Sequence, residues 1–291
     1  KLGYYMKGNP FGEKGDFITA PHISILFSEM IAIWIISFWE SLKCPSKFNL
    51  IELGAGNGEM MKVLVNTFDK FPKFKDACNI NILEKSELLK KLQKEKIKNK
   101  NIKWLKNLNK LNNLPSIFIA NEFFDALPIK QFIKKKNKWY ERHVKFNKIK
   151  KLEYLDVPFD MQKFEQKIKL KISYKQSFIE YSPLTMDFLK NITNKIKLNN
   201  GGILIIDYGY INKEIKNTLQ AVYKHKYMNV LASFRNSDIT YNLSFDLIDK
   251  MIKKFGTFCS LITTQKKFLT KLGILQRAEI LSKNMPFSKK A

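Results

Sequence analysis

From residue 48 onward, short apolar runs alternate with segments of helical periodicity. The apolar runs predict buried strands, and helical patterns lie between most of them. This alternation is typical of βαβ units, so we expect an α/β fold with a mostly parallel sheet. The predicted strands cover residues 48–53, 79–83, 102–105, 116–120 and 203–207, with a further strand near 258–263.

Amphipathic and apolar patterns predict the helices. Four of them are predicted over 24–42, 183–198, 245–255 and 274–283. Another follows the glycine turn after the first strand and ends at about residue 71, and one more begins after Ser86. The helix predicted over 24–42 contains the most apolar run, residues 30–39. This run is far shorter than the roughly 20 residues that a membrane span requires. We therefore expect a buried helix and no membrane span.

Two regions depart from this alternation. Residues 129–157 show the period-two pattern of β-hairpins, and residues 158–177 are lysine-rich and weakly patterned. We interpret about 130–178 as an insertion into a domain that spans 46–291. Residues 1–22 are rich in glycine and aromatic residues, which indicates an ordered, turn-rich segment.

Composition narrows the class of protein. A chain of 291 residues with 45% hydrophobic residues can form one large α/β domain with a substantial core. The three cysteines and three histidines are scattered along the chain, so we expect a reduced, intracellular protein without a disulfide framework or a metal site.

The net charge of +26 allows two interpretations. It is compatible with a nucleic-acid partner. However, the lysines are spread along the whole chain beside many Asn and Ile residues, as coding bias in an AT-rich genome also produces. Because no Arg-rich or aromatic-interleaved motif concentrates the charge, we favour the second interpretation and expect no nucleic-acid partner.

A glycine loop follows the first predicted strand. Gly54, Gly56 and Gly58 occupy it, and a helix begins immediately afterwards. Glycine permits a tight turn and close approach of a ligand to the backbone, and the helix N-terminus offers free N–H donors. The strand ends in Glu52, and Glu84 ends the next strand. This context predicts a nucleoside-binding site.

The acids distinguish between cofactors. Glu84 is placed to accept hydrogen bonds from ribose hydroxyls, which both nicotinamide dinucleotides and S-adenosylmethionine carry. Glu52 would repel a pyrophosphate but neutralise the methionine ammonium of S-adenosylmethionine. The loop spacing also differs from the dinucleotide G-x-G-x-x-G pattern. We therefore favour S-adenosylmethionine; the alternative is a Rossmann-like domain that binds no cofactor.

Polar residues cluster after the fourth predicted strand. Asn121, Glu122 and Asp125 accompany two phenylalanines there, and ligands of open α/β sheets bind outside the carboxyl ends of strands. Neighbouring carboxylates repel each other unless a cation offsets them, and a guanidinium is a planar, bidentate partner. We expect Glu122 and Asp125 to orient an arginine substrate for in-line methyl transfer, with Asn121 accepting a hydrogen bond or positioning the cofactor.

With these residues in place, the chain resembles the MidA-like methyltransferases, relatives of a mitochondrial complex I assembly protein that methylates arginine. The most specific strings are Gly15-Asp16-Phe17-Ile18-Thr19-Ala20-Pro21 and Asn121-Glu122-Phe123-Phe124-Asp125-Ala126-Leu127-Pro128. The glycine loop and the strings Glu180-x-Ser182-Pro183 and Ile206-Asp207-Tyr208-Gly209 also match.

The resemblance implies a class I methyltransferase with a Rossmann-like core and a seven-stranded, mostly parallel sheet. It implies that an N-terminal segment, residues 1–45, folds over the cofactor, that Asp16 and Thr19 line the cofactor site, and that the β-rich and helical insertion shapes the substrate site. It also raises Glu180 and Asp207 as cleft residues, each of which is equally well explained by a structural role.

The same resemblance implies a protein arginine N-methyltransferase that acts on a respiratory-chain subunit during assembly of a complex I-type NADH dehydrogenase. We expect it in the bacterial cytoplasm or, alternatively, the mitochondrial matrix. Two other functions stay open: methylation of a nucleic acid or another small substrate, and a non-catalytic assembly chaperone. His22 stands where the family has glutamate, and we interpret it as a tolerated surface substitution.

Overall fold

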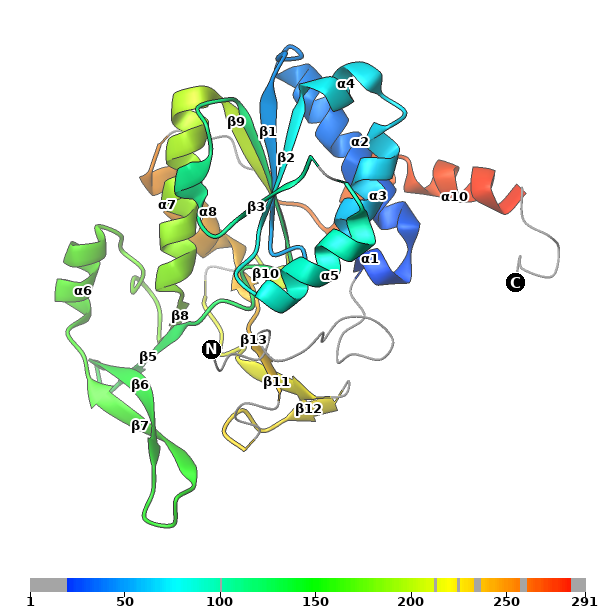
Figure 1. Cartoon of the computed structure of the whole chain (residues 1–291). Coiled ribbons are helices and arrows are strands. Elements are labelled where there is room, and N and C mark those ends of the chain that lie inside the picture. Colours follow the sequence, from blue (N-terminus) through cyan, green and yellow to red (C-terminus); the bar gives the residue numbers. More distant parts are fainter. Residues whose placement is uncertain are drawn as a thin grey trace.

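A five-stranded parallel sheet forms the centre of the protein, and helices cover both of its faces (Figure 1). The computed structural model describes residues 20–99, 101–211, 214–223, 226–232, 237–256 and 261–283. In spatial order the strands are β3 (Lys103–Leu105), β2 (Cys78–Leu83), β1 (Phe48–Leu53), β4 (Ser116–Asn121) and β9 (Gly201–Ile206). The α/β class and the parallel sheet predicted from the pattern are confirmed.

The strand register brings the carboxyl ends of the central strands together. Glu52 lies beside Ile82 of β2 and Ile119 of β4, and Asn121 lies beside Ile206 of β9. The loops that follow β1, β2, β4 and β9 therefore leave the sheet at one edge. Four of the predicted acids lie at or just after these strand ends: Glu52, Glu84, Glu122 and Asp207.

One face of the sheet packs against α2 (Ile25–Ser41) and α3 (Glu59–Phe68). Ser24 caps α2 by accepting a hydrogen bond from the Leu26 N–H, as expected for a helix beginning there. The helix after the glycine loop ends earlier than predicted, because Pro72 starts a separate helix, α4 (Pro72–Ala77). α5 (Glu87–Ile97), capped by Ser86, and the short helices α1 (Ala20–Ile23) and η2 (Leu108–Lys110) complete this half of the chain.

The opposite face packs against α7 (Pro183–Asn199) and α8 (Phe245–Lys254), which Ser182 and Ser244 cap. The chain then returns to the first face through α9 (Gln265–Lys271) and α10 (Ile274–Lys283). Arg277 of α10 donates two hydrogen bonds to the carboxylate of Glu29 on α2, at 2.8 and 2.9 Å. A bidentate pair of this kind fixes α10 against α2.

The insertion forms a separate antiparallel sheet in the order β7-β6-β5-β8, at the lower left of Figure 1. Its strands are β5 (Lys130–Lys135), β6 (Lys138–Phe146), β7 (Leu152–Pro158) and β8 (Phe178–Tyr181), so the predicted hairpins are confirmed. The weakly patterned stretch contains an unpredicted helix, α6 (Met161–Ile168). Its Phe164 packs against Phe132 and Phe159, which explains why a short helix is stable there.

The expected seven-stranded sheet is not found, because the described residues place five strands in the main sheet. β14 (Leu243–Ser244) pairs with β10 (Gly209–Tyr210) instead of joining it. β11 (Gln220–Tyr223), β12 (Lys226–Met228) and β13 (Asp238–Thr240) form a small antiparallel sheet. The strand predicted near 258–263 falls partly outside the described residues, and residues 261–263 are not in a strand.

None of the helices in the described ranges is long and apolar enough to cross a membrane.

Candidate functional site

The glycine loop leaves β1 with three residues in left-handed backbone conformation. Gly54, Gly56 and Gly58 have φ values of 66°, 53° and 85°. At Gly54 a side chain is also excluded, because a Cβ would lie 2.8 Å from the Phe123 ring. Gly58 precedes α3 without a side-chain cap, so no side chain occupies the N–H donors at this end of the helix. The loop therefore combines bare backbone with a helix N-terminus.

Glu52 is buried beneath this loop with an unsatisfied oxygen. The residue is 3% exposed, and its Oε2 has no hydrogen-bond partner among the described residues. Burial, together with the nearby carboxylate of Glu84, raises the pKa of Glu52 to about 8. A buried carboxyl group without donors is costly, so Glu52 is poised to pair with a cationic ligand group.

Glu84, at the end of β2, has donors on both oxygens. Its Oε1 accepts a hydrogen bond from the Ser86 N–H at 2.8 Å, and its Oε2 accepts one from Gln93 Nε2 at 3.0 Å. Burial still raises the pKa of Glu84, and these two donors oppose that rise. The carboxylate is thus held in one orientation and keeps lone pairs for further donors such as ribose hydroxyls.

Gln93 is a site residue that the sequence reasoning missed. Its side chain is fully buried, and Nε2 also donates a hydrogen bond to the Gly56 carbonyl at 2.8 Å. Its Oε1 accepts from Trp104 Nε1 at 2.9 Å. One amide therefore joins the glycine loop, Glu84 and β3. The signal in the sequence is a polar residue between Leu89 and Ile97 on the buried face of α5.

The segment after β4 begins with two polar residues in unusual surroundings. Asn121 Oδ1 is buried and has no partner among the described residues. Glu122 has a φ of 47°, a left-handed conformation that is strained for a residue with a side chain. Burial raises the pKa of Glu122 to about 7, although hydrogen bonds from the Ala20 backbone and the Asn121 side chain oppose that rise. Strain and burial of this kind are concentrated at functional sites.

Asp125 and Asp207 form a second buried pair of acids. Asp207 Oδ2 accepts hydrogen bonds from the Phe124 and Asp125 N–H groups at 3.1 and 3.3 Å, and its Oδ1 accepts from the Tyr208 N–H at 2.9 Å. Asp125 Oδ1, in contrast, has no partner among the described residues. Burial raises the pKa of both groups, and the neighbouring acids raise that of Asp125 further.

A cleft beneath α1 brings together most of the predicted residues. Glu52, Gly54, Gly56, Asn121 and Glu122 line it. Gly58 and Glu84 lie behind it, at the start of α3 and in contact with Gln93, and Asp125 follows Glu122 at the strand end. Asp16 and Thr19 lie outside the described residues, so their assignment to the cofactor site remains a prediction, as does the role of 1–45 as a cover.

Two residues have other roles than the sequence suggested. His22 is not a surface substitution: it is half-buried in the cleft, and its Nε2 lies 3.1 Å from Oδ1 of Asn57 in the glycine loop. Glu180 has a structural role, since its Oε1 accepts hydrogen bonds from Gln131, Thr218 and Leu219, and its Oε2 accepts one from the Thr218 hydroxyl.

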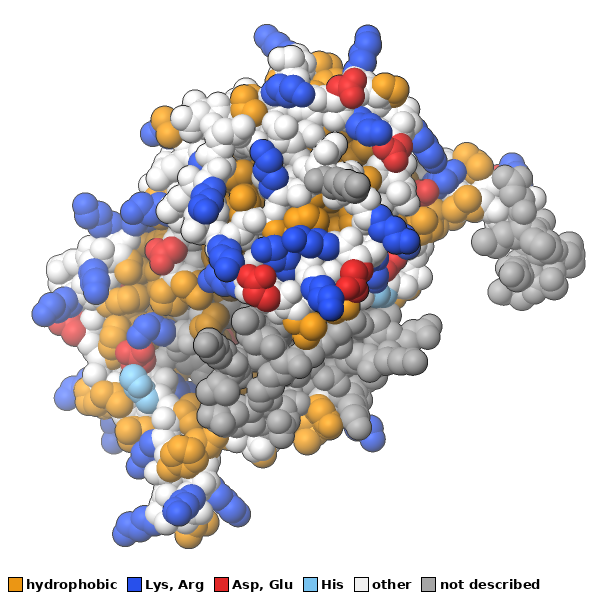
Figure 2. Space-filling model, in the orientation of Figure 1, with side chains coloured by type: hydrophobic (Ala, Val, Ile, Leu, Met, Phe, Trp, Pro, Cys, Tyr) orange, Lys and Arg blue, Asp and Glu red, His pale blue; other side chains and the backbone are white. Residues whose placement is uncertain are grey.

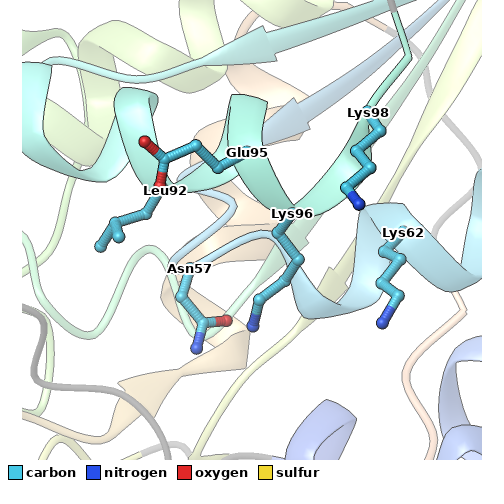
Figure 3. Close-up of a pocket in the computed structure, with 6 residues that line it drawn as sticks. All are labelled: Asn57, Lys62, Leu92, Glu95, Lys96 and Lys98. Atoms are coloured by element: carbon cyan, nitrogen blue, oxygen red, sulfur yellow. The ribbon is translucent and has the colours of Figure 1, made fainter.

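A second hollow lies outside the glycine loop, between α3 and α5 (Figure 3). Its lining includes Asn57 and three lysines, Lys62, Lys96 and Lys98. The salt bridge between Lys96 Nζ and Glu59 Oε2, at 2.6 Å, separates it from the cleft, because Glu59 lines the cleft side. None of the predicted site residues lies in this hollow, and Asn57 lines both the hollow and the cleft.

Comparisons with known proteins show what this chain is similar to. A family model described as "Putative S-adenosyl-L-methionine-dependent methyltransferase" matches residues 30–262. The protein named "Protein arginine methyltransferase NDUFAF7, mitochondrial" is 28% identical in Xenopus laevis over 303 residues, which cover 96% of this chain and 69% of the relative. The human protein of the same name is also 28% identical, with coverage of 96% and 68%.

Solved structures show the same fold. A Burkholderia thailandensis protein of the COG1565 superfamily, in a crystal structure with bound S-adenosyl-homocysteine, superposes with a TM-score of 0.80 at 21% identity, over 99% of this chain and 76% of that one. A native crystal structure of a COG1565 protein from the same organism gives a TM-score of 0.76 at 20% identity, over 98% and 76%. At this identity the likeness establishes the fold.

Proposed function

We propose that this chain, which belongs to the family of S-adenosyl-L-methionine-dependent methyltransferases, methylates a nitrogen of an arginine side chain in a protein substrate. The names of its relatives in Xenopus and human support arginine as the acceptor. The resemblance to MidA-like proteins supports a subunit of a complex I-type NADH dehydrogenase, met during assembly, as the substrate protein.

The observation that carries the proposal is that Glu122 and Asp125 are withdrawn from solvent beside other acids, with no salt bridge to either among the described residues. The electrostatic neighbours that raise the pKa of Asp125 are Asp207, Glu122 and Asp238. Among the described residues, the main influences on the pKa of Glu122 and Asp125 include no lysine or arginine. Such a group is unfavourable unless it binds a cation, and a guanidinium supplies a positive charge and paired N–H donors.

The residues of the other half of the cleft fit the cofactor. The unsatisfied Glu52 Oε2 suits an ammonium group, the glycine loop allows close approach of a ligand, and Glu84 presents an oriented carboxylate for ribose hydroxyls. When bound, S-adenosylmethionine supplies an electrophilic methyl carbon on a sulfonium sulfur.

The residues of this chain then bind and orient the acceptor. Glu122 and Asp125 would hold the guanidinium so that the lone pair of one nitrogen faces the methyl carbon. As the N–C bond forms, the C–S bonding electrons stay on sulfur, and the acceptor nitrogen loses a proton. Since the pKa of Glu122 is raised to about 7, its carboxylate can take that proton at neutral pH.

The direct test supplies the purified protein with methyl-labelled S-adenosylmethionine and an extract of cells that lack the gene. We expect one dominant labelled protein, with the label on an arginine identified by mass spectrometry. Label on lysine or on nucleic acid would contradict arginine as the acceptor. Calorimetry that detects no S-adenosylmethionine binding would point instead to a chaperone that retains the fold.

Glu122→Gln separates substrate chemistry from cofactor binding. It keeps the size of the side chain, and we expect it to leave S-adenosylmethionine affinity within about three-fold while methylation falls by at least about 100-fold, the scale of removing one partner of a buried charge pair. The matched control is Glu279→Gln on α10, whose carboxylate pairs with Lys283 on the surface. Full activity in Glu122→Gln would remove Glu122 from the mechanism.

A further inference from the structure

The hairpin formed by β6 and β7 projects from the insertion, away from the body of the protein (Figure 1). Its end, residues 144–151, is called the hairpin tip here. Two large apolar side chains are exposed in it, Phe146 at 67% and Ile149 at 70%, and Val144 beside them is 53% exposed. Tyr154, which faces Val144 across the strands, is 41% exposed.

The hairpin tip is an ordered turn, so this exposure is built into the fold. Asn147 Oδ1 accepts hydrogen bonds from the Ile149 and Lys151 N–H groups, at 3.1 and 2.9 Å. The Asn147 N–H donates to the Lys151 carbonyl at 2.8 Å, and the Lys150 N–H donates to the Asn147 carbonyl at 3.0 Å. An Asx turn of this type fixes Ile149 at the apex and Phe146 at the last position of β6.

The charge around these apolar residues has one sign. The hairpin tip contains Lys145, Lys148, Lys150 and Lys151 and no acid. The three acids farther along the hairpin already pair with basic groups: Glu153 with Lys145, Asp156 with Lys135 and Arg142, and Glu141 with Lys130. Hydrophobic and basic side chains are seen together at the lower end of the hairpin in Figure 2. An unbalanced positive charge therefore surrounds the exposed apolar residues.

We propose that the hairpin tip docks the protein onto an anionic phospholipid bilayer, with Phe146 and Ile149 entering the outer apolar layer and the lysines contacting lipid phosphates. In a bilayer, an apolar acyl layer lies directly beneath a layer of anionic phosphates. Lysine side chains can extend along apolar surface while their ammonium groups stay at the phosphates. A narrow projecting turn reaches a flat surface without a matching groove. Stable attachment takes an apolar and a basic element together, and the hairpin tip has both.

The test measures co-sedimentation of the full chain with vesicles of phosphatidylcholine alone and with vesicles in which phosphatidylglycerol replaces about a quarter of it. We expect binding to the second kind and at least about ten-fold weaker binding to the first. Since each lysine near an anionic surface contributes about five-fold, the triple variant Lys148→Gln, Lys150→Gln, Lys151→Gln should bind the anionic vesicles about 100-fold more weakly.

Two further variants make the test specific to the hairpin tip. Lys43→Gln, Lys70→Gln, Lys73→Gln removes the same net charge from exposed residues near α4 and should change binding less than about three-fold. Phe146→Ser, Ile149→Ser keeps every lysine and should abolish the binding that remains at high salt. Equal losses in the two lysine triples, or undiminished binding of the serine variant at high salt, would overturn the proposal. So would a lack of binding to the anionic vesicles, including the case in which the tip binds an acidic protein instead.

Discussion

The two ends of the cleft are built alike, because at each end one buried carboxylate accepts hydrogen bonds on both oxygens and the neighbouring one does not. On the β1–β2 side, Glu84 has donors on both oxygens while Glu52 has an unsatisfied one. On the β4–β9 side, Asp207 accepts three backbone hydrogen bonds while Asp125 has an unsatisfied oxygen. Each side thus combines one carboxylate that accepts hydrogen bonds on both oxygens, called tied here, with one that has an oxygen without a partner among the described residues, called free here.

This difference in hydrogen bonding within each pair predicts which acids bind a ligand. A tied carboxylate has its charge stabilised by the protein, so its removal should disturb the fold. The charge of a free carboxylate is stabilised less by the protein, so removing that carboxylate should leave the fold intact and abolish an interaction with a cation. On this comparison we expect Glu52 and Asp125 to bind cationic ligand groups, and Glu84 and Asp207 to combine structural with positioning roles.

The largest expected effect comes from comparing Asp125→Asn with Asp207→Asn. Asp125→Asn replaces a carboxyl group whose charged form is disfavoured by burial and by the neighbouring acids, so it should keep or raise the stability of the protein while methylation falls by at least about 100-fold. Asp207→Asn replaces one of the two acceptor oxygens with an NH2 donor that would face backbone N–H donors, so it should destabilise the fold by roughly 1–3 kcal/mol. Urea unfolding and turnover measured on both variants check this. If Asp125→Asn unfolds more easily than Asp207→Asn, the distinction between free and tied acids is wrong.

A smaller effect should follow from the protonation of Glu52. Its pKa of about 8 means that the free protein holds a proton there at pH 7, whereas a cationic ligand group requires the carboxylate. Cofactor binding should therefore release close to one proton at pH 7, and affinity should fall about ten-fold between about pH 7 and pH 6. Calorimetry in buffers of different ionisation heat measures the release.

The same group has the opposite effect on the stability of the ligand-free protein. Since the folded pKa lies above the unfolded value of 4.5, the contribution of Glu52 to stability is complete below about pH 4.5 and falls by up to about 1.4 kcal/mol per unit as pH rises toward 8. Glu52→Gln should remove both the slope and the proton release. Glu59→Gln is the control, because its pKa is lowered and it is already ionised. Unchanged proton release in Glu52→Gln would assign the proton to another group.

Local sequence signals predicted much of this site. Gly54, Glu52 and Glu122 were found because a strand end followed by glycine or by acids is a pattern within a few residues. The strands 48–53 and 116–121 were predicted almost to the residue. A short apolar run flanked by polar turns is too short for a typical helix and therefore favours a buried strand.

The features that the sequence did not predict depend on contacts between residues far apart in the chain. The role of Asp207 requires β9 to lie beside β4, about 80 residues away, and no local pattern shows that adjacency. The strand count was wrong because β14 is two residues long and pairs with β10 before Ser244 caps α8. Likewise, the place of His22 depends on the packing of α1 against the glycine loop.

The smallest effect concerns Gln93, whose side chain donates a hydrogen bond to Glu84. A variant at this position shows whether that hydrogen bond matters for cofactor binding. Gln93→Met fills the same space but removes the donor to Glu84 and Gly56 and the acceptor for Trp104. Glu84 loses one of its two donors, its pKa should rise further, and the carboxylate should be less fixed. We expect KM for S-adenosylmethionine to rise about five-fold with kcat unchanged, equivalent to about 1 kcal/mol.

A merely structural role for Gln93 would give a different result, and a second buried glutamine provides the comparison. Gln176 is buried in the insertion, and its Oε1 accepts a hydrogen bond from the Ile215 N–H at 2.7 Å. Gln176→Met should cost stability comparable to Gln93→Met but leave KM for the cofactor unchanged. If both variants shift KM equally, the effect comes from a general loss of stability. The hydrogen bond from Gln93 would then not be what orients the Glu84 carboxylate toward the ribose.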